Sequence, residues 1–221
     1  MIYATMCVGS EWIDRFKKSI NEFSKSNELH LLTDDKSDFN DNITLYRYTR
    51  DVFSYYEKIK FILDLSKKYE ERITYIDSDW ISQYNTNLKY DTLSLYTYLS
   101  VDISSNKDNE LRWVGPFEKK LKNGLLLNQI MINKGGNIPY YIAEALISFP
   151  YQKNIDELIN DSKILQTFLE NHYTTVAKTR SRLNRYKNGI GYAEGWGISA
   201  LCVKYNIDIK EVTEWRKKTL L

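Results

Sequence analysis

Two aspartates separated by one residue follow directly on a short apolar run in this chain. The run is Ile73–Ile76, and the aspartates are Asp77 and Asp79. Because alternate side chains of an extended segment point the same way, both carboxylates can face one site. Two carboxylates held close together repel each other unless a cation lies beside them. The pair is typical of a site for Mn²⁺ or Mg²⁺, which take oxygen ligands and often share them with substrate phosphates.

The same pair also suits a plain polar turn, because Asp and Ser are common where a strand ends. Its place in the chain favours a site. The segments before it predict repeated strand–helix units, and in open α/β sheets ligands bind beyond the carboxyl ends of the strands. The aspartates follow the fourth predicted strand, so they stand where a ligand would be held.

The first 80 residues carry the clearest structural pattern. Apolar runs and alternation predict strands, and apolar residues at helical spacing predict helices between them. The predicted strands are 2–8, 29–32, 43–48 and 73–76, and the predicted helices are 12–23, capped by Ser10, and 55–69. This order is typical of an α/β protein with a mainly parallel central sheet flanked by helices.

The second half is less regular. Strands are predicted at 93–103 and 124–136, and a helix is predicted from Pro139 through Phe149. Asp161 is a predicted N-cap of a further helix, and the pair Asp208 and Glu211 has the spacing of a capping box for a last one. The segment 178–196 is basic and then rich in glycine, which predicts a loop.

Length and composition are those of an ordinary globular protein. The chain has 221 residues, a formal net charge of +2, 43% hydrophobic and 27% charged residues. A surface for a polyanion would therefore need local clustering of basic residues. Cys7 and Cys202 lie in apolar runs without metal-ligand spacing, which predicts buried thiols and a reducing compartment. We expect a cytoplasmic protein, since no apolar stretch is long enough to span a membrane and the N-terminus lacks the pattern of a signal peptide.

The aspartate pair and its surroundings resemble a known enzyme family. The segment EKIKFILDLSKKYEERITYIDSDW, 57–80, is similar to the Asp-x-Asp region of GT-A glycosyltransferases, most of all the retaining enzymes related to glycogenin, bacterial galactosyltransferases and blood-group transferases. The start MIYATMCVGSEW and the segment LHLLTDD resemble their first βαβ unit. The resemblance implies one GT-A domain over 1–221, with a nucleotide-binding half, 1–85, and an acceptor half, 86–221.

The same resemblance implies roles for particular residues. The first strand supports the base and ribose of the nucleotide in these families, which corresponds to Ala4, Thr5 and Met6 here. The basic residue of the helix before the motif corresponds to Lys58, which would face the diphosphate. A solvated helix lysine is the alternative for Lys58.

For the motif itself, the resemblance implies that Asp77 meets the ribose and the metal and that Asp79 binds the metal directly. Glu194, in YAEGWGISALCVKY, corresponds to a late acid near the sugar or the acceptor; a helix N-terminal acid favoured by the dipole is its alternative. Several of these families add a late histidine as a third metal ligand. The histidines of this chain are His30 and His172, and neither is predicted to be a ligand.

A basic segment follows the less regular part of the chain. Lys178, Arg180, Arg182, Arg185 and Lys187 are crowded into it. It could be a lid whose cations, including Arg182 and Arg185, meet the donor diphosphate and exclude water. It could also be a surface for an anionic acceptor, or a solvated basic face.

The sequence thus predicts a metal-dependent glycosyltransferase that uses Mn²⁺ or Mg²⁺ and a nucleoside-diphosphate sugar, with UDP as the favoured nucleotide. Resemblance favours retention of configuration but leaves inversion open. A nucleotidyltransferase, a phosphatase of the Asp-x-Asp type and a non-catalytic nucleotide-sugar binder are the alternatives. The acceptor, whether glycan, protein, lipid or modified nucleic acid, and the oligomeric state stay open.

Overall fold

The structure is a computed structural model that describes residues 1–35, 39–50, 54, 56–97, 100–102, 140–142, 145–173, 194–212 and 214–216. The predictions for 124–136 and for 178–193 of the basic, glycine-rich loop lie outside these ranges, whereas 194–196, predicted as the end of that loop, are helical. The elements in chain order are β1 (Ile2–Cys7), α1 (Ser10–Ser24), β2 (Leu29–Thr33), β3 (Ile43–Arg47), α2 (Glu57–Tyr69), β4 (Ile73–Ile76), the 3₁₀ turn η1 (Ile81–Gln83), β5 (Leu95–Thr97), β6 (Ser100–Asp102), β7 (Tyr140–Ile142), β8 (Leu146–Phe149), α4 (Ile155–Tyr173), α5 (Glu194–Tyr205) and β9 (Ile209–Glu211).

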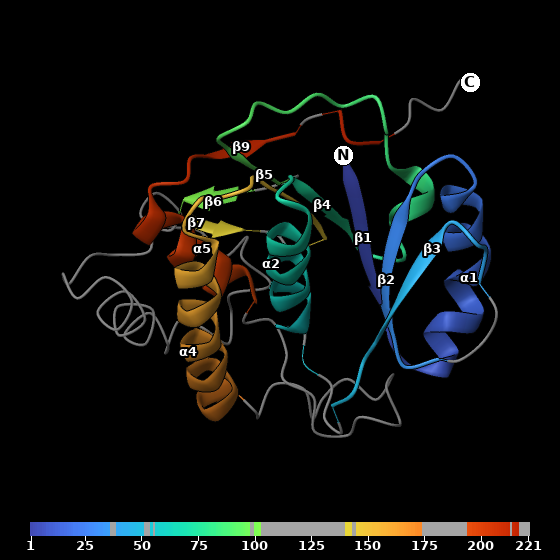
Figure 1. Cartoon of the computed structure of the whole chain (residues 1–221), viewed down its shortest axis with the longest axis horizontal. Helices are drawn as coiled ribbons and strands as arrows, with labels where there is room; N and C mark the ends of the chain where they lie inside the picture. Colours follow the sequence, from blue (N-terminus) through green and yellow to red (C-terminus); the bar gives the residue numbers. More distant parts are fainter. Residues whose placement is uncertain are drawn as a thin grey trace.

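A seven-stranded sheet, in the order β3-β2-β1-β4-β8-β5-β9, forms the centre of the protein (Figure 1). Strands β3, β2, β1 and β4 pair in parallel, and β9 pairs in parallel with β5. Only β8 runs against its neighbours β4 and β5 in this sheet. Strands β6 and β7 form a separate antiparallel pair. The predicted class, an α/β fold with a mainly parallel central sheet flanked by helices, is confirmed.

The strand order changes direction at β1. The chain steps outward from β1 through β2 to β3, and then passes through α2 to β4 on the other side of β1. Such a reversal opens a crevice outside the carboxyl ends of the two central strands, which is where open α/β sheets bind ligands. The sheet therefore places the ends of β1 and β4 side by side at the mouth of this crevice.

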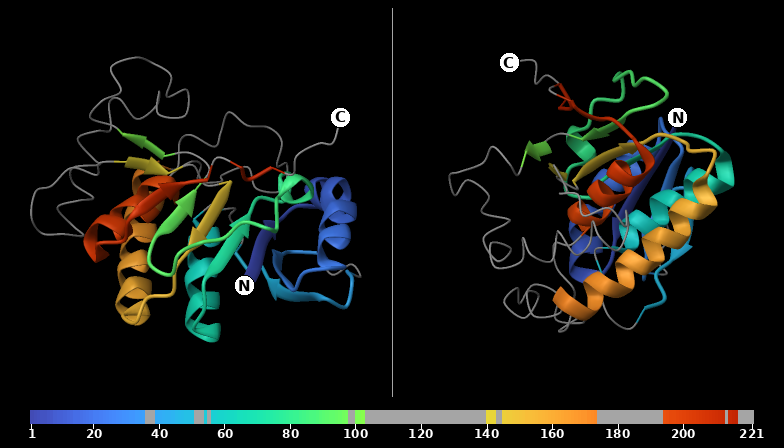
Figure 2. Two further views of the ribbon diagram at one scale, coloured as in Figure 1. Left: turned by 90° about the horizontal axis from the view of Figure 1, so that it is seen from above. Right: turned by 90° about the vertical axis from the view of Figure 1, so that its left-hand side faces the viewer.

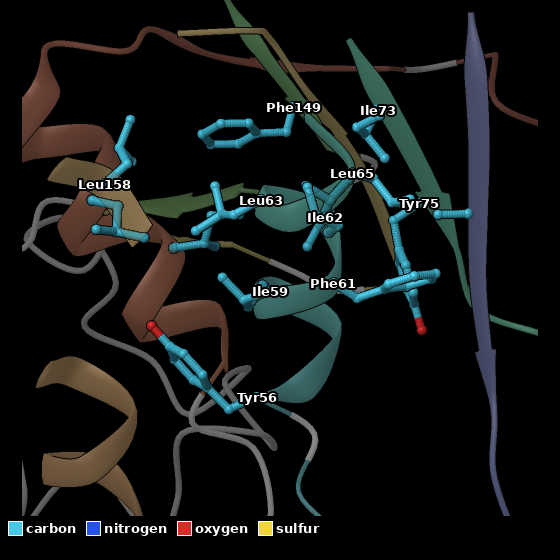
Figure 3. Close-up of a cluster of buried hydrophobic side chains, with 14 of the residues drawn as sticks. Tyr56, Ile59, Phe61, Ile62, Leu63, Leu65, Ile73, Tyr75, Phe149 and Leu158 are labelled. Carbon is cyan, nitrogen blue, oxygen red and sulfur yellow. The ribbon is translucent and has the colours of Figure 1, made fainter. Parts of the chain in front are cut away.

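Helices cover both faces of the sheet (Figure 2). Side chains of β1 alternate between the faces: Ala4 and Met6 join a buried cluster with α2, α4 and α5, whereas Tyr3 and Cys7 join a second cluster with α1. Figure 3 shows the first cluster, in which residues of α2 pack against Tyr75 of β4 and Phe149 of β8. The two clusters hold α1 and α2 on opposite faces of the sheet.

The first half of the chain folds as its pattern predicts, with one correction. The four strands and two helices lie within a few residues of their predicted bounds, and β4 matches residue for residue. Ser10, however, is the first helical residue of α1 rather than its cap. Gly9 is the cap residue, with φ of 96°, and its carbonyl accepts hydrogen bonds from the N–H groups of Trp12 and Ile13. A glycine suits this position because other residues rarely adopt a positive φ.

The helix predicted through Phe149 is wrong, because β7 and β8 lie in its place. Strand β8 is inserted between β4 and β5, and all four of its side chains are buried. A strand buried on both faces reads as a short unbroken apolar run, which periodicity alone does not distinguish from a buried helix segment. The predicted strand over 93–103 is in turn divided into β5 and β6.

Two predicted helix caps are also wrong. Asp161 lies inside α4, where its carboxylate accepts a hydrogen bond from Tyr205 of α5 at 2.5 Å and pairs with Lys204 at 2.5 Å. The predicted capping box at Asp208 and Glu211 instead brackets strand β9, whose backbone pairs with β5. At Asp161 a tertiary contact uses the carboxylate that local capping would have used, and at 208–211 backbone pairing with β5 replaces the predicted helix.

Other predictions concern the cysteines and the membrane. Cys7 and Cys202 are free and buried, as predicted. Among the helices that the structure describes, none has the length and apolar character needed to cross a membrane.

The contact between α5 and the start of α2 leaves no room for a side chain at Gly197. A Cβ there would lie 2.5 Å from Cε2 of Tyr56. We expect Gly197→Ala to lower the free energy of unfolding by about 1–3 kcal/mol, because the Tyr56 ring must shift. Denaturant unfolding measures this loss. In Tyr56→Leu the same glycine substitution should cost less, and an equal cost in both backgrounds would contradict the contact.

Candidate active site

The aspartate pair lies just beyond the carboxyl end of β4, the strand that pairs with β1. Asp77 directly follows β4, and its N–H donates a hydrogen bond to the carbonyl of Ala145 at 2.8 Å. The N–H of Trp80 donates to the carbonyl of Asp77 at 2.9 Å, so 77–80 form a tight turn. This turn places both carboxylates just beyond the carboxyl end of a central strand.

A buried lysine from α2 contacts the first aspartate. The ammonium of Lys58 lies 3.1 Å from Oδ1 of Asp77, and the Tyr75 hydroxyl donates to the same oxygen at 2.9 Å. Only 3% of the Lys58 side chain is exposed, against 30% of the Asp77 side chain. The ammonium also lies 5.3 Å from the centre of the Tyr75 ring. Lys58 is therefore a buried cation at the site, and the alternative of a solvated helix lysine is wrong.

The second aspartate reaches solvent in a negatively charged neighbourhood. Partial desolvation by the surrounding chain, and then the negative charge of Asp77, raise the pKa of the Asp79 carboxyl, while Lys58 and Arg15 act in the opposite direction. Within the described ranges this carboxylate accepts a hydrogen bond from its own backbone N–H, and no side chain forms an ion pair with it. A cation bound beside Asp77 and Asp79 would relieve the repulsion between them.

Arg15 brings a second positive charge to the site from the other layer of helices. It belongs to α1, where its guanidinium lies 5.2 Å from the centre of the Phe16 ring and 6.0 Å from that of Trp12. It is close enough to Asp79 to lower the pKa of that carboxyl. The sequence pattern did not single out Arg15, because only the packing of α1 beside the turn brings it near.

Strand β2 adds two further carboxylates at this edge. The N–H of Gly9 donates to Oδ1 of Asp34 at 2.8 Å, which joins the end of β2 to the start of α1. Burial raises the pKa of the Cys7 thiol to about 12; a hydrogen bond with Ser78 opposes this, and the charges of Asp34, Asp35 and Asp79 add to it. Cys7 is thus a protonated thiol among the ends of three strands. Parallel strands end at one edge, and that rule could have drawn Asp34 and Asp35 into the predicted site.

The residues predicted to support the nucleotide lie inside β1. Ala4 and Thr5 are completely buried, and Met6 is 8% exposed. The hydroxyl of Thr5 is buried without a hydrogen-bond partner among the described residues. Val8 and Gly9 follow at the strand end, closer to the crevice than Ala4 along the chain. The roles of Ala4, Thr5 and Met6 stay predictions.

The remaining predicted residues belong to the second half. Glu194 is the first residue of α5, and its side chain is not among those described. Gly197, one turn along α5, contacts Tyr56, which immediately precedes α2. The start of α5 therefore lies beside the start of α2, the helix that carries Lys58. Arg182 and Arg185 lie outside the described residues, so their roles stay predictions.

The site suits a hard divalent cation because it offers the carboxylate oxygens of Asp77 and Asp79. Asp79 forms no ion pair with the described side chains. No group of three or more His, Cys, Asp or Glu side chains in the described ranges is arranged to hold a metal ion. His30 is buried in β2, where desolvation lowers its pKa and its ring centre lies 5.0 Å from that of Tyr69. His30 is therefore a core residue, as predicted, and the His172 side chain is not described.

The raised pKa of Asp79 has a consequence for stability. The folded-state pKa of such a carboxyl exceeds its unfolded-state value of about 3.9. It therefore stabilises the fold at pH values below about 3.9, and this contribution is lost as the pH rises through the folded-state pKa. Without divalent cations we therefore expect Asp79→Asn to raise the Tm at pH 7 by about 1–2 °C, a small value because the residue is exposed. The gain should vanish below about pH 4.

Thermal unfolding at both pH values, with EDTA present, measures this effect. Asp14→Asn, an exposed aspartate of α1, is the matched control and should leave the Tm unchanged. A lower Tm for Asp79→Asn at pH 7 would mean that the charge of Asp79 stabilises the fold, contrary to the electrostatics described above.

No protein-family model matches the chain, and a search of curated proteins found no match either. Among solved structures, the chain is similar to the crystal structure of the glycosyltransferase GlyE in Streptococcus pneumoniae TIGR4, with a TM-score of 0.44 and 11% sequence identity. The similarity covers 96% of this chain and 44% of that one, so this chain spans less than half the length of that protein. A similarity of this degree supports no conclusion about activity.

Proposed function

We propose that this chain is a metal-dependent glycosyltransferase that moves a sugar from a nucleoside-diphosphate sugar, with UDP as the favoured nucleotide, to an acceptor. The observation that carries the proposal is the turn at Asp77 and Asp79 beyond the end of β4, with Lys58 buried against it. It lies at the reversal of strand order, where nucleotides bind in open α/β sheets. Carboxylates and a buried ammonium together suit a diphosphate held through a divalent cation.

The two aspartates are the proposed ligands of Mn²⁺ or Mg²⁺. When bound, such an ion neutralises charge that develops on the leaving diphosphate. Asp77 is held in place by Lys58 and Tyr75, which both donate to Oδ1. Asp79 is exposed, and its carboxylate would bind the ion directly. A divalent cation would need the negative charge of both aspartates, and an Asn in place of either one would remove half of that charge.

The reaction breaks the bond between the anomeric carbon and the diphosphate and forms a new one to an acceptor hydroxyl, whose proton passes to a base or to the leaving diphosphate. Lys58 lies next to the turn and would share the negative charge of the leaving diphosphate. Arg15 stands on the opposite layer and would add a second positive charge. Glu194 is the proposed carboxylate near the anomeric carbon. It would act as a base if the reaction inverts the configuration, and it would stabilise positive charge at that carbon if the reaction retains it.

Removal of one carboxylate charge tests the proposal. We expect Asp79→Asn to lower Mn²⁺-dependent release of nucleoside diphosphate at least about 100-fold, because one of two protein ligands loses its charge. Incubation with a panel of nucleotide sugars, with and without Mn²⁺, measures the released nucleotide and identifies the donor. Release of pyrophosphate instead would favour a nucleotidyltransferase.

Asp14→Asn serves again as the control and should keep full activity. The same pair of variants should differ in Mn²⁺-induced thermal stabilisation, with a Tm increase in the control and none in Asp79→Asn. Full activity of Asp79→Asn with the donor that the unmodified protein uses would refute the metal site.

Lys58 allows a second test. Lys58→Met keeps the length of the side chain but removes the charge, so the affinity for UDP in the presence of Mn²⁺ should fall about 10- to 100-fold, the loss of one charge-assisted contact. Calorimetry measures this affinity. Lys60→Met is the matched control, because Lys60 is two residues along α2 and half exposed. Equal UDP affinity in the two variants would remove Lys58 from the donor site.

A further inference from the structure

The aspartate turn is joined to an aromatic stack. Trp80 is the last residue of the turn and directly follows Asp79. Its ring stacks on that of Trp215, with ring centres 4.2 Å apart and an angle of 7° between the planes. The guanidinium of Arg216 lies 4.5 Å from the centre of the Trp215 ring and 5.9 Å from that of Trp80. Trp80 is thus held by a partner from the far end of the sequence.

The backbone fixes this partner beside the turn. The N–H of Asn85 donates to the carbonyl of Trp215 at 2.8 Å, and its side-chain amide donates to the carbonyl of Glu214 at 3.3 Å. Tyr84 and Arg216 form an isolated antiparallel bridge. In Figure 1 the red C-terminal segment returns to the green segment that carries η1. Residues 214–216, which we term the C-terminal clamp, are therefore attached directly behind the aspartate turn.

The stack restricts the freedom of Asp79. Trp215 is 8% exposed, so its ring cannot move without opening the packed layer around α1. The Trp80 ring is covered on one face by Trp215, and the backbone N–H of Trp80 donates to the carbonyl of Asp77. The peptide unit between Asp79 and Trp80 is thereby held from its Trp80 side. Ligand carboxylates need placement to about 0.5 Å, and the supporting residues behind them supply it.

We propose that Trp215 is a positioning residue, which holds the Asp79 carboxylate in place for a divalent cation through its stack on Trp80. This inference rests on the proposed function of the aspartate pair. It assigns to the last part of the described chain a role in the site that the first half builds. Trp215 itself touches neither the cation nor the substrate in this proposal.

The test measures Mn²⁺ affinity in the presence of UDP by the electron paramagnetic resonance signal of free Mn²⁺. We expect Trp215→Ala to weaken Mn²⁺ binding about tenfold or more, as loss of an orienting residue behind a ligand typically does. Trp215→Phe keeps an aromatic face against Trp80 and should restore the affinity to within about threefold.

Two controls separate positioning from general stability. Ile20→Ala removes a completely buried side chain from the same layer and should lower the Tm without changing Mn²⁺ affinity. Unfolding curves show that each variant is folded at the temperature of the titration. If Trp215→Ala did not fold there, the comparison of Trp215→Phe with Trp215→Leu, which keeps bulk but not the flat face, would decide the question.

The outcomes distinguish this inference from the proposed function. The positioning role is wrong if Trp215→Ala binds Mn²⁺ as tightly as the unmodified protein does. It is also wrong if Trp215→Phe and Trp215→Leu bind Mn²⁺ equally. Neither result would contradict the aspartate site itself. An equal loss in Ile20→Ala would overturn it as well, because stability alone would then explain the effect. An unmodified protein that binds no Mn²⁺ would overturn both.

Discussion

The contact between Lys58 and Asp77 is the interaction around which the site is organised. A lysine that is 3% exposed must have a partner that compensates its charge, because an isolated buried ammonium is very costly. That partner is the first residue beyond β4, 3.1 Å away. The pairing ties the first turn of α2 to the end of a central strand. It thereby adds to the hydrophobic packing of the helix on the sheet and restricts the aspartate side chain.

The Lys58–Asp77 pair leaves the negative charge of Asp79 without an ion-pair partner among the described side chains. Lys58 and Tyr75 both act on one oxygen of Asp77, whereas Asp79 keeps a raised pKa because of partial desolvation and the charge beside it. Positive charge also reaches Asp79 from Arg15 on the opposite layer. The aspartate pair thus receives positive charge from each layer of helices, from Lys58 on one side of the sheet and Arg15 on the other. This distribution suits an anionic ligand that arrives with a metal ion.

In the part of the chain that the structure describes, the second half adds β8, β5 and β9 to the central sheet and packs α4 and α5 on one of its faces. Strand β8 pairs with β4 from Ile73 to Ile76, and the carbonyl of Ala145 accepts the N–H of Asp77. Strand β8 thus covers the edge of β4, and the residue before it, Ala145, accepts the first backbone hydrogen bond of the aspartate turn. At the other end of the same turn, the C-terminal clamp covers Trp80. Segments remote in sequence therefore enclose the motif from both sides.

The sequence by itself determined the class of fold, the strands and helices of the first half and the place of the aspartate pair. These features are local: strand and helix periods are read from neighbouring residues, and an Asp-x-Asp after an apolar run needs no distant partner to be recognised. It also indicated Lys58 as a site residue, although only through resemblance to a known family. The sequence did not reveal how Lys58 is held.

Tertiary structure alone decided the rest. Residues 146–149 form a strand because β4 and β5 offer free edges on both sides, and Asp161 pairs with α5 because that helix packs on α4. Arg15 and Trp215 reach the site for the same reason, since neither carries a local signal of its role. Contacts between residues far apart in the chain depend on which faces meet after folding, and a linear pattern holds no record of those distances.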